Sequence, residues 1–285
     1  MGLNRQVLCR PLLLDHDEEM RVTRRIWWGE FKAADFADID PEATIAVLPL
    51  AAIEQHGPHL PLSTDADIMA GMIGEVASRL PDDLDVRFLP VQAIGKSTEH
   101  LFAPGALSIS PAALLDAWMQ IGDAVATTGI RKIVLITSHG GNEELMGILA
   151  REWRVKHNML AVKSSWGRFG YPDGLYSDEE LRLGVHGGDY ETSLMLHFRP
   201  DLVDMAKAED FSSPFGKMAK QFELLRPHGN FGFAWTAQDL NPAGVVGNAA
   251  AATAEKGQIT AAHQAEGFVT LLKDIRKARL SDILA

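Results

Sequence analysis

Short apolar segments alternate with longer helical patterns along this chain. The apolar segments are rich in β-branched residues, which favour strands. They are residues 44–50 (TIAVLPL), 86–91 (VRFLPV), 132–137 (KIVLIT) and 160–164 (LAVKS). Helical patterns are expected at about residues 66–80, 111–129, 142–157 and 250–279. Strands that alternate with helices in this way predict an α/β fold with a parallel sheet and crossover helices.

Two segments do not share this alternation. Residues 1–25 have no clear period and are predicted to form an N-terminal arm, which leaves residues 26–285 as a single domain. Residues 200–248 contain Pro, Gly and aromatic residues without a regular pattern. Because a long irregular segment in a compact domain commonly has a role, we expect this one to be a functional lid or an interface.

The composition limits the partners and the cellular location that are expected for the protein. Of the 285 residues, 46% are hydrophobic, which is enough to bury a large core. The formal charge of −11 argues against nucleic acids and anionic membranes as partners, because both bind clustered Lys and Arg. The single cysteine, Cys9, excludes an intramolecular disulfide, and no apolar run approaches the roughly 20 residues that cross a bilayer. We therefore expect a cytoplasmic protein.

Three clusters of polar residues lie near the ends of predicted elements. They are residues 54–65 (EQHGPHLPLSTD), 138–144 (SHGGNEE) and 186–193 (HGGDYETS). The first two clusters directly follow predicted strands, and the third begins a helical pattern. In open α/β sheets, ligands bind beyond the carboxyl ends of the strands, so these clusters mark the expected site.

The clusters combine His with Asp and Glu and contain no Cys. This is the ligand set of Zn, Mn or Fe at a hydrolytic centre rather than that of a structural zinc site. Glu54 and His56 point the same way in an extended segment, because side chains alternate with a period of two. Asp65 lies where a helix begins, so its carboxylate could reach back and bridge two ions. Taken alone, Asp65 could equally be a helix N-cap, and a lone histidine is more often structural than a ligand.

Longer motifs around these clusters resemble the creatininase family of metal-dependent amidohydrolases. The main motifs are residues 54–65, SHGGN at 138–142 and HGGDYETSLML at 186–196, in that order. Further matches are GKSTEH at 95–100, RPDLVD at 199–204 and GVVGN at 244–248. The resemblance therefore covers about residues 27–275. Chance is a poor explanation for motifs of this length that occur in this order.

The resemblance implies a three-layer α/β/α fold with a mainly parallel central sheet, usually assembled as a homohexamer. It also implies two divalent metal ions in each subunit. By motif position, Glu54 and His139 hold one ion and His56 holds the other. Asp65 bridges the two ions in this arrangement.

Two departures indicate a wider-family member rather than creatininase itself. In creatininase the His of the second motif is followed by Tyr-Glu-Asn, and that Glu is a metal ligand, whereas Gly141 stands in its place here. The fifth ligand is therefore predicted to be Glu191, with Asp189 or Glu99 as alternatives. Creatininase also has a Trp-Asp pair that forms part of its creatinine pocket, where this chain has RLGV at 182–185, so creatinine is not the expected substrate.

The third motif is expected to supply proton transfer. His186 is predicted to donate a proton to the leaving group or to hold the oxyanion, because imidazole suits proton transfer near neutral pH. Glu191 or Asp189 could act as the base. His59 fits a role as support for a ligand as well as it fits a ligand itself.

Three further residues are predicted to contact a small-molecule substrate. Ser97 and Glu99 follow the second predicted strand, and Trp235 lies in the irregular segment. A local turn would explain the first two equally well, and core packing would explain Trp235. The function expected is hydrolysis of a C–N bond by a water that two metal ions activate. The alternatives are hydrolysis of a keto-cyclitol or lactone-like ring on the same scaffold, and a non-catalytic protein that binds metal or ligand.

Overall fold

A four-stranded parallel sheet forms the centre of the molecule. The computed structural model of the chain describes residues 24–227 and 229–283, so nearly all of the predicted N-terminal arm (1–25) lies outside the described residues. The strands are arranged in the order β2-β1-β3-β4. Their bounds are β1 (Ile45–Leu50), β2 (Val86–Phe88), β3 (Lys132–Thr137) and β4 (Leu160–Ser165). All four predicted strands are therefore present, and each neighbouring pair is parallel.

The two central strands are mostly apolar because both faces of the sheet are covered; the exceptions are Lys132 and Thr137, at the two ends of β3. Every residue of β1 and of β3 is buried. Ile45 and Val47 of β1 belong to the hydrophobic cluster on one face, and Ala46 and Leu48 belong to the cluster on the other. Side chains that alternate between two buried faces require a nearly continuous apolar run, as the sequence pattern indicated.

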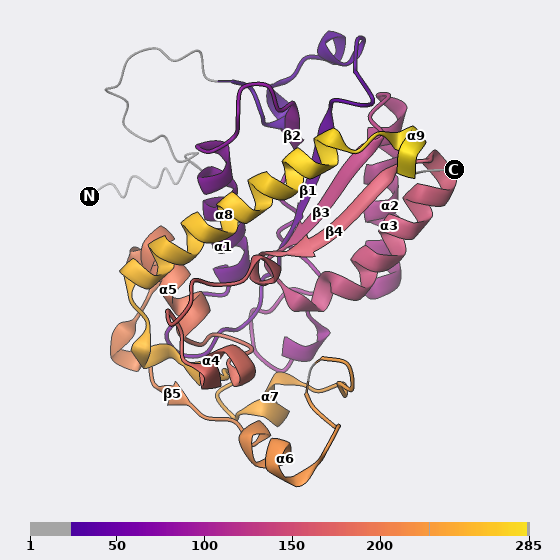
Figure 1. Cartoon of the computed structure of the whole chain (residues 1–285). Coiled ribbons are helices and arrows are strands. Elements are labelled where there is room, and N and C mark those ends of the chain that lie inside the picture. The colour runs from indigo at the N-terminus through magenta and orange to yellow at the C-terminus, as the bar shows by residue number, and fades with distance from the viewer. Residues whose placement is uncertain (1–23, 228, 284–285) are drawn as a thin grey trace, which may run out of the picture.

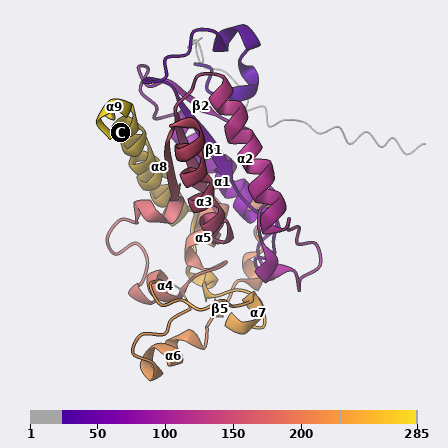
Figure 2. The ribbon, with the colours of Figure 1, turned by 90° about the vertical axis from the view of Figure 1, so that its right-hand side faces the viewer.

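Five long helices form the outer layers. On one face lie α1 (Thr64–Ala77), α5 (Asp189–Phe198) and α8 (Ala254–Lys277). On the other face lie α2 (Pro111–Thr127) and α3 (Glu143–His157). Helix α8 crosses the sheet diagonally (Figure 1), and the side view places α8 and α2 on opposite sides of the sheet (Figure 2). The predicted three-layer α/β/α fold is confirmed.

The second strand is shorter than the pattern predicted. β2 ends at Phe88, whereas the apolar run continues to residue 91. Pro90 has no N–H group and cannot continue the ladder of hydrogen bonds. The chain nevertheless stays beside β1, because the backbone N–H of Gln92 donates to the carbonyl of Pro49 at 2.9 Å.

The last long helix begins later than expected. Thr253 caps its first turn, since the threonine side chain accepts a hydrogen bond from the backbone N–H of Lys256 at 3.2 Å. Residues 250 and 251, which the pattern placed in the helix, belong to a separate 3₁₀ turn at 249–251. None of the helices in the described part of the chain is long and apolar enough to span a bilayer.

The irregular segment contains several short elements that gather at one end of the molecule (Figures 1 and 2). They are α6 (Phe215–Gln221), α7 (Ala237–Leu240) and the antiparallel pair β5 (Asp210–Phe211) and β6 (Gly247–Asn248), with α4 (Asp178–Leu183) nearby. The last described element is α9 (Leu280–Ile283). Val246 and His186 exchange two backbone hydrogen bonds, of 2.8 and 3.3 Å. The segment therefore contacts one of the predicted site residues directly.

Candidate metal centre

Four predicted ligands meet beyond the carboxyl ends of the two central strands. Glu54 and His56 lie on the segment that leaves β1, Asp65 lies in the first turn of α1, and His139 comes two residues after β3. A hydrogen bond of 3.0 Å from Glu54 N–H to the carbonyl of Leu62 closes the loop between β1 and α1. The exposed fractions are 1% for Glu54, His56 and Asp65 and 5% for His139. Four ionisable side chains are therefore gathered out of contact with water.

Among the described residues, three sets of ligand atoms could hold a cation: two share the carboxylate of Asp65, and the third joins Glu54, His56 and His186. Glu54, Asp65 and His139 make the first set, and His56, Asp65 and Glu191 make the second, with the ligand atoms of each set within 4.8 Å of one another. Asp65 Oδ1 lies 3.6 Å from His56 Nε2, and Asp65 Oδ2 lies 3.6 Å from His139 Nδ1. Glu191, in the first turn of α5, places Oε2 3.8 Å from His56 Nε2. The geometry suits two cations with Asp65 between them.

Backbone carbonyls determine which nitrogen of each imidazole carries its proton. A carbonyl oxygen can only accept, so His139 Nε2–H donates to the carbonyl of Lys96 at 2.8 Å, and His56 Nδ1–H donates to that of Glu54 at 3.1 Å. The opposite nitrogen of each ring then presents a lone pair to carboxylates when the ring is neutral. A lone pair and a carboxylate oxygen repel each other unless a proton or a metal ion lies between them. A second nitrogen held by a carbonyl is also the usual arrangement of a metal-binding histidine.

Unpaired polar atoms are concentrated at the same place. Among the described residues, five buried side-chain N or O atoms have no hydrogen-bond partner. Three of the five are Glu54 Oε1, His56 Nε2 and Asp65 Oδ2. Buried polar atoms without partners are rare and costly, so their convergence on one point indicates that a bound cation completes the site.

The pKa values follow from this arrangement. Burial alone would lower the pKa of His56, but nearby carboxylates, Asp65 first, raise it to about 9. Burial acts in the same direction on His139, whose pKa the Glu54 carboxylate raises to about 10. Burial raises the pKa of Glu191 to about 7 against the opposing charge of His56. In the metal-free protein each of these two imidazoles therefore carries a second proton, and a positive charge, at neutral pH. A divalent cation can replace that second proton.

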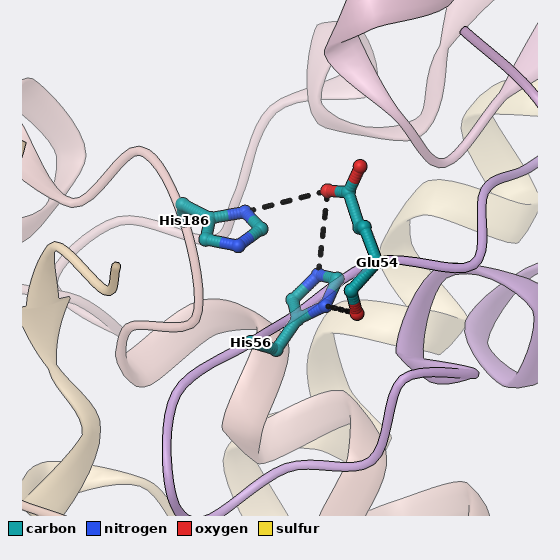
Figure 3. A group of neighbouring side chains, drawn as sticks. All are labelled: Glu54, His56 and His186. Carbon is teal, nitrogen blue, oxygen red and sulfur yellow. Dashed lines mark hydrogen bonds and ion pairs between the residues drawn. The ribbon is translucent and has the colours of Figure 1, made fainter. Parts of the chain in front are cut away.

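His186, from the third motif, approaches the carboxylate of Glu54 (Figure 3). Its Nε2–H donates to the carbonyl of Gln55 at 2.6 Å, and its Nδ1 lies 3.7 Å from Glu54 Oε1. The ring is 4.1 Å, centroid to centroid, from that of His56. Burial and the neighbouring histidines hold the pKa of His186 well below its usual range, so this imidazole is neutral.

Two residues to which the sequence analysis gave no role also face the cluster. Gln55 Nε2 donates to His100 Nδ1 at 2.9 Å, which leaves the proton of His100 on Nε2, 3.4 Å from Glu54 Oε1. Burial lowers the pKa of His100 to about 4. The signal was present, since His100 ends the GKSTEH motif and Gln55 stands between two predicted ligands.

Two predicted substrate contacts lie against the ligands. Ser97 is fully buried, and its hydroxyl donates to Glu54 Oε2 at 2.5 Å, so it orients that carboxylate. Glu99 accepts a hydrogen bond from Lys96 Nζ at 2.7 Å through Oε2, while its Oε1 lies 3.7 Å from His139 Nε2. Both side chains therefore belong to the surroundings of the cluster.

The structure does not bring Asp189 into the cluster. Its Oδ2 accepts a hydrogen bond from Lys256 Nζ at 2.5 Å, and its Oδ1 accepts one from Ser193 at 3.0 Å. A carboxylate that is paired in this way holds α5 against α8. Of the two third-motif acids, only Glu191 faces the predicted ligands.

His59 and Trp235 take part in packing around the site. His59 Nε2–H is shared between Thr192 Oγ1 at 2.9 Å and the carbonyl of Gly187 at 3.1 Å, which ties the first loop to the start of α5. Trp235 donates to the carbonyl of Pro227 at 2.8 Å. It also packs on the small hydrophobic cluster formed by Phe215, Leu240 and Val246.

Comparison with known proteins decides the family. Residues 29–272 match the creatininase family, described as creatinine amidohydrolase. The chain belongs to the creatininase family. It is thereby a metal-dependent hydrolase.

Individual relatives in this family carry several names. The mycofactocin precursor peptide peptidase of Mycolicibacterium smegmatis is 29% identical over 231 residues, which are 80% of this chain and 84% of that protein. The 3-dehydro-scyllo-inosose hydrolase of Thermotoga maritima is 25% identical over 250 residues, 83% of this chain and 76% of that protein. A solved structure named Creatininase Mn superimposes with a TM-score of 0.70 at 22% identity, over 88% of this chain and 98% of the other. This likeness supports the fold, and the relatives confirm a wider-family member.

Proposed function

We propose that this creatininase-family enzyme hydrolyses an amide or cyclic amide bond of a small molecule with the help of two divalent metal ions. Glu54, Asp65 and His139 hold one ion, and His56, Asp65 and Glu191 hold the other. The observation that carries the proposal is the pair of imidazoles whose N–H groups are bonded to backbone carbonyls and whose other nitrogens face shared carboxylates. Zn, Mn and Fe all suit this ligand set.

The absence of a glutamate at position 141 does not deprive the second set of its carboxylate. Glu191 lies within reach of His56 Nε2 and supports the fifth-ligand assignment. When bound, the two ions would lower the pKa of a water molecule and polarise the carbonyl of the scissile bond.

Residues of the chain then move the protons. Glu191 is the proposed base that accepts the proton of the attacking water, because its carboxylate lies beside the proposed ligands. His186 is neutral and carries its proton on Nε2, so its Nδ1 presents a lone pair that can take over the proton from Glu191 and pass it to the leaving nitrogen. Asp189 is the weaker choice of base because Lys256 already pairs with it.

A second reaction on the same scaffold is favoured by one relative. The Thermotoga maritima protein named 3-dehydro-scyllo-inosose hydrolase aligns over most of this chain. Opening of a keto-cyclitol or lactone-like ring could use the same two ions and the same acid and base. Turnover of such a ring without cleavage of any amide would replace the first proposal with this one.

The remaining proposals concern the setting of the enzyme. We infer a cytoplasmic homohexamer, supported by the single cysteine and by the resemblance to creatininase. The net charge of −11 supports a small-molecule substrate rather than a nucleic acid or a membrane surface.

Metal content and hydrolysis measured together test the proposed function. Purified protein should contain about two divalent ions per chain by elemental analysis, and hydrolysis of a panel of small amides, cyclic amides and keto-cyclitols should stop on chelation and return with metal. His139→Gln should empty one position and abolish turnover. His263→Gln is the matched control, because His263 is remote from the cluster and bonds to the carbonyl of Phe169. Fewer than about half an ion per chain after reconstitution would favour a non-catalytic protein.

A further inference from the structure

Gly141 is closely surrounded although it has no side chain. A Cβ atom at this position would overlap Glu99 Oε1 and His139 Nε2, and it would lie 2.6 Å from the carbonyl oxygen of Lys96. A Cβ atom added to the neighbouring Gly140 would have no other atom within 4 Å. The space that a side chain at 141 would occupy is therefore filled by Glu99, which comes from a different loop.

The carboxylate of Glu99 stands between a lysine and a proposed ligand. Its Oε2 accepts from Lys96 Nζ at 2.7 Å, and its Oε1 lies 3.7 Å from His139 Nε2. That nitrogen is the one turned away from Glu54 and Asp65, which face Nδ1. Glu99 therefore lies behind the ligand histidine and not among the atoms that would touch the ion.

The second motif holds the Glu99 loop in place. Asn142 Oδ1 accepts a hydrogen bond from Lys96 N–H at 3.0 Å, and Asn142 Nδ2 donates to the carbonyl of Ala51 at 3.1 Å. In the sequence SHGGN, the histidine faces the carboxylates, the second glycine leaves room for Glu99, and the asparagine positions the backbone of Lys96. The same Lys96 backbone accepts the N–H of His139.

We propose that Glu99 is a positioning residue for His139, admitted to its place by Gly141, and that its charge raises the affinity of the ion held by Glu54, Asp65 and His139. This inference rests on the proposed two-ion site. An imidazole that gives a lone pair to a cation gains positive charge, and a carboxylate near its other nitrogen stabilises that charge. The Glu99 side chain is only 13% exposed, so water screens this attraction less than it would at the surface.

The affinity of a single ion is the quantity to measure. Glu191→Gln alters a ligand that belongs only to the second set, so in this background the first ion can be titrated alone by competition with a coloured zinc chelator. Adding Glu99→Gln, which keeps the size of the side chain but removes its charge, should raise the dissociation constant for Zn about tenfold or more. Lys96→Gln is the control, because it keeps Glu99 and the backbone carbonyl that holds His139. It should bind Zn as tightly as the background or more tightly.

The two adjacent glycines provide an independent comparison in the same background. Gly141→Ala should weaken zinc binding at least as much as Glu99→Gln, since its methyl group displaces Glu99 and His139. Gly140→Ala, with open space around it, should bind zinc like the background. If circular dichroism shows that Gly141→Ala does not fold, the comparison of zinc affinity between Glu99→Gln and Lys96→Gln is sufficient to test the role of Glu99.

Each outcome separates this inference from the proposed function. Unchanged zinc affinity in Glu99→Gln, in a protein whose unsubstituted form binds two ions, would overturn the role of Glu99 and leave the metal centre standing. Equal losses in Glu99→Gln and Lys96→Gln would also overturn it, because only their mutual pairing would then matter. A protein without metal before any substitution would refute the proposed function and this inference together.

Discussion

Metal affinity should depend steeply on pH, because cations and protons compete for the same nitrogens. Carboxylates around the buried rings raise the pKa of His139 to about 10 and that of His56 to about 9 against the effect of burial. Each ion must therefore displace one imidazole proton at any pH below these values. Affinity is lost as the pH falls, since raised pKa values favour the protonated, metal-free form.

The size of the effect follows from the number of protons displaced. One proton per ion changes the affinity about tenfold per pH unit, so the ion at His139 should bind about 100-fold more weakly at pH 6 than at pH 8. The ion at His56 also requires an ionised Glu191, whose pKa of about 7 lies inside this range. That group adds about another tenfold, for a total near 1000-fold, or about 4 kcal/mol.

Competition with a chelator at pH 6, 7 and 8 measures how the affinity of each of the two ions changes with pH. The pH dependence of the chelator itself is determined separately. Glu191→Gln isolates the ion at His139, which should retain the slope of about tenfold per unit. Calorimetry in buffers of different ionisation enthalpy should count the released protons directly. A zinc affinity that changes less than about threefold between pH 6 and pH 8 would refute the reasoning, because no proton would then be displaced from His139.

Further substitutions test other parts of the site and of the fold. Asp65→Asn should lower the metal content at both positions, whereas His56→Gln should empty mainly one; elemental analysis distinguishes them, and equal losses would contradict the bridging role of Asp65. Ser97→Ala removes the hydroxyl donor to Glu54 and should weaken zinc binding about tenfold in chelator competition; an unchanged affinity would show that Ser97 does not support the ligand. Gly57 has a φ of +78°, and a Cβ atom there would overlap Val245, so Gly57→Ala should cost at least about 1–2 kcal/mol of folding free energy and lower the midpoint of thermal unfolding by at least about 2–8 °C; an unchanged midpoint would contradict both the strain and the overlap.

Local sequence determined the central elements of the fold. β1 and β3 are buried on both faces, and a strand in that position must be nearly continuously apolar, which makes it visible as a short β-branched run. The side-chain directions of two proposed ligands next to β1 were also predictable. Glu54 and His56 follow β1 two residues apart, and alternation along an extended chain directs them the same way.

Only the tertiary structure decided which of the remaining polar residues face the site. The sequence favoured Glu191 over Asp189 as a ligand but left both as candidate bases; in the structure Lys256, 67 residues further along the chain, pairs with Asp189 and leaves Glu191 facing His56. His100 joins the cluster through Gln55, 45 residues earlier in the chain.

The position of Glu99 beside Gly141 is likewise a contact between segments that are distant in sequence. Its loop follows β2, whereas Gly141 follows β3, so no local pattern relates the two positions. Periodicity describes the direction of a side chain relative to its own element. The partners of a buried charge come from the packing of segments that are distant in sequence, and for this chain that packing determined which residues surround the proposed metal ligands.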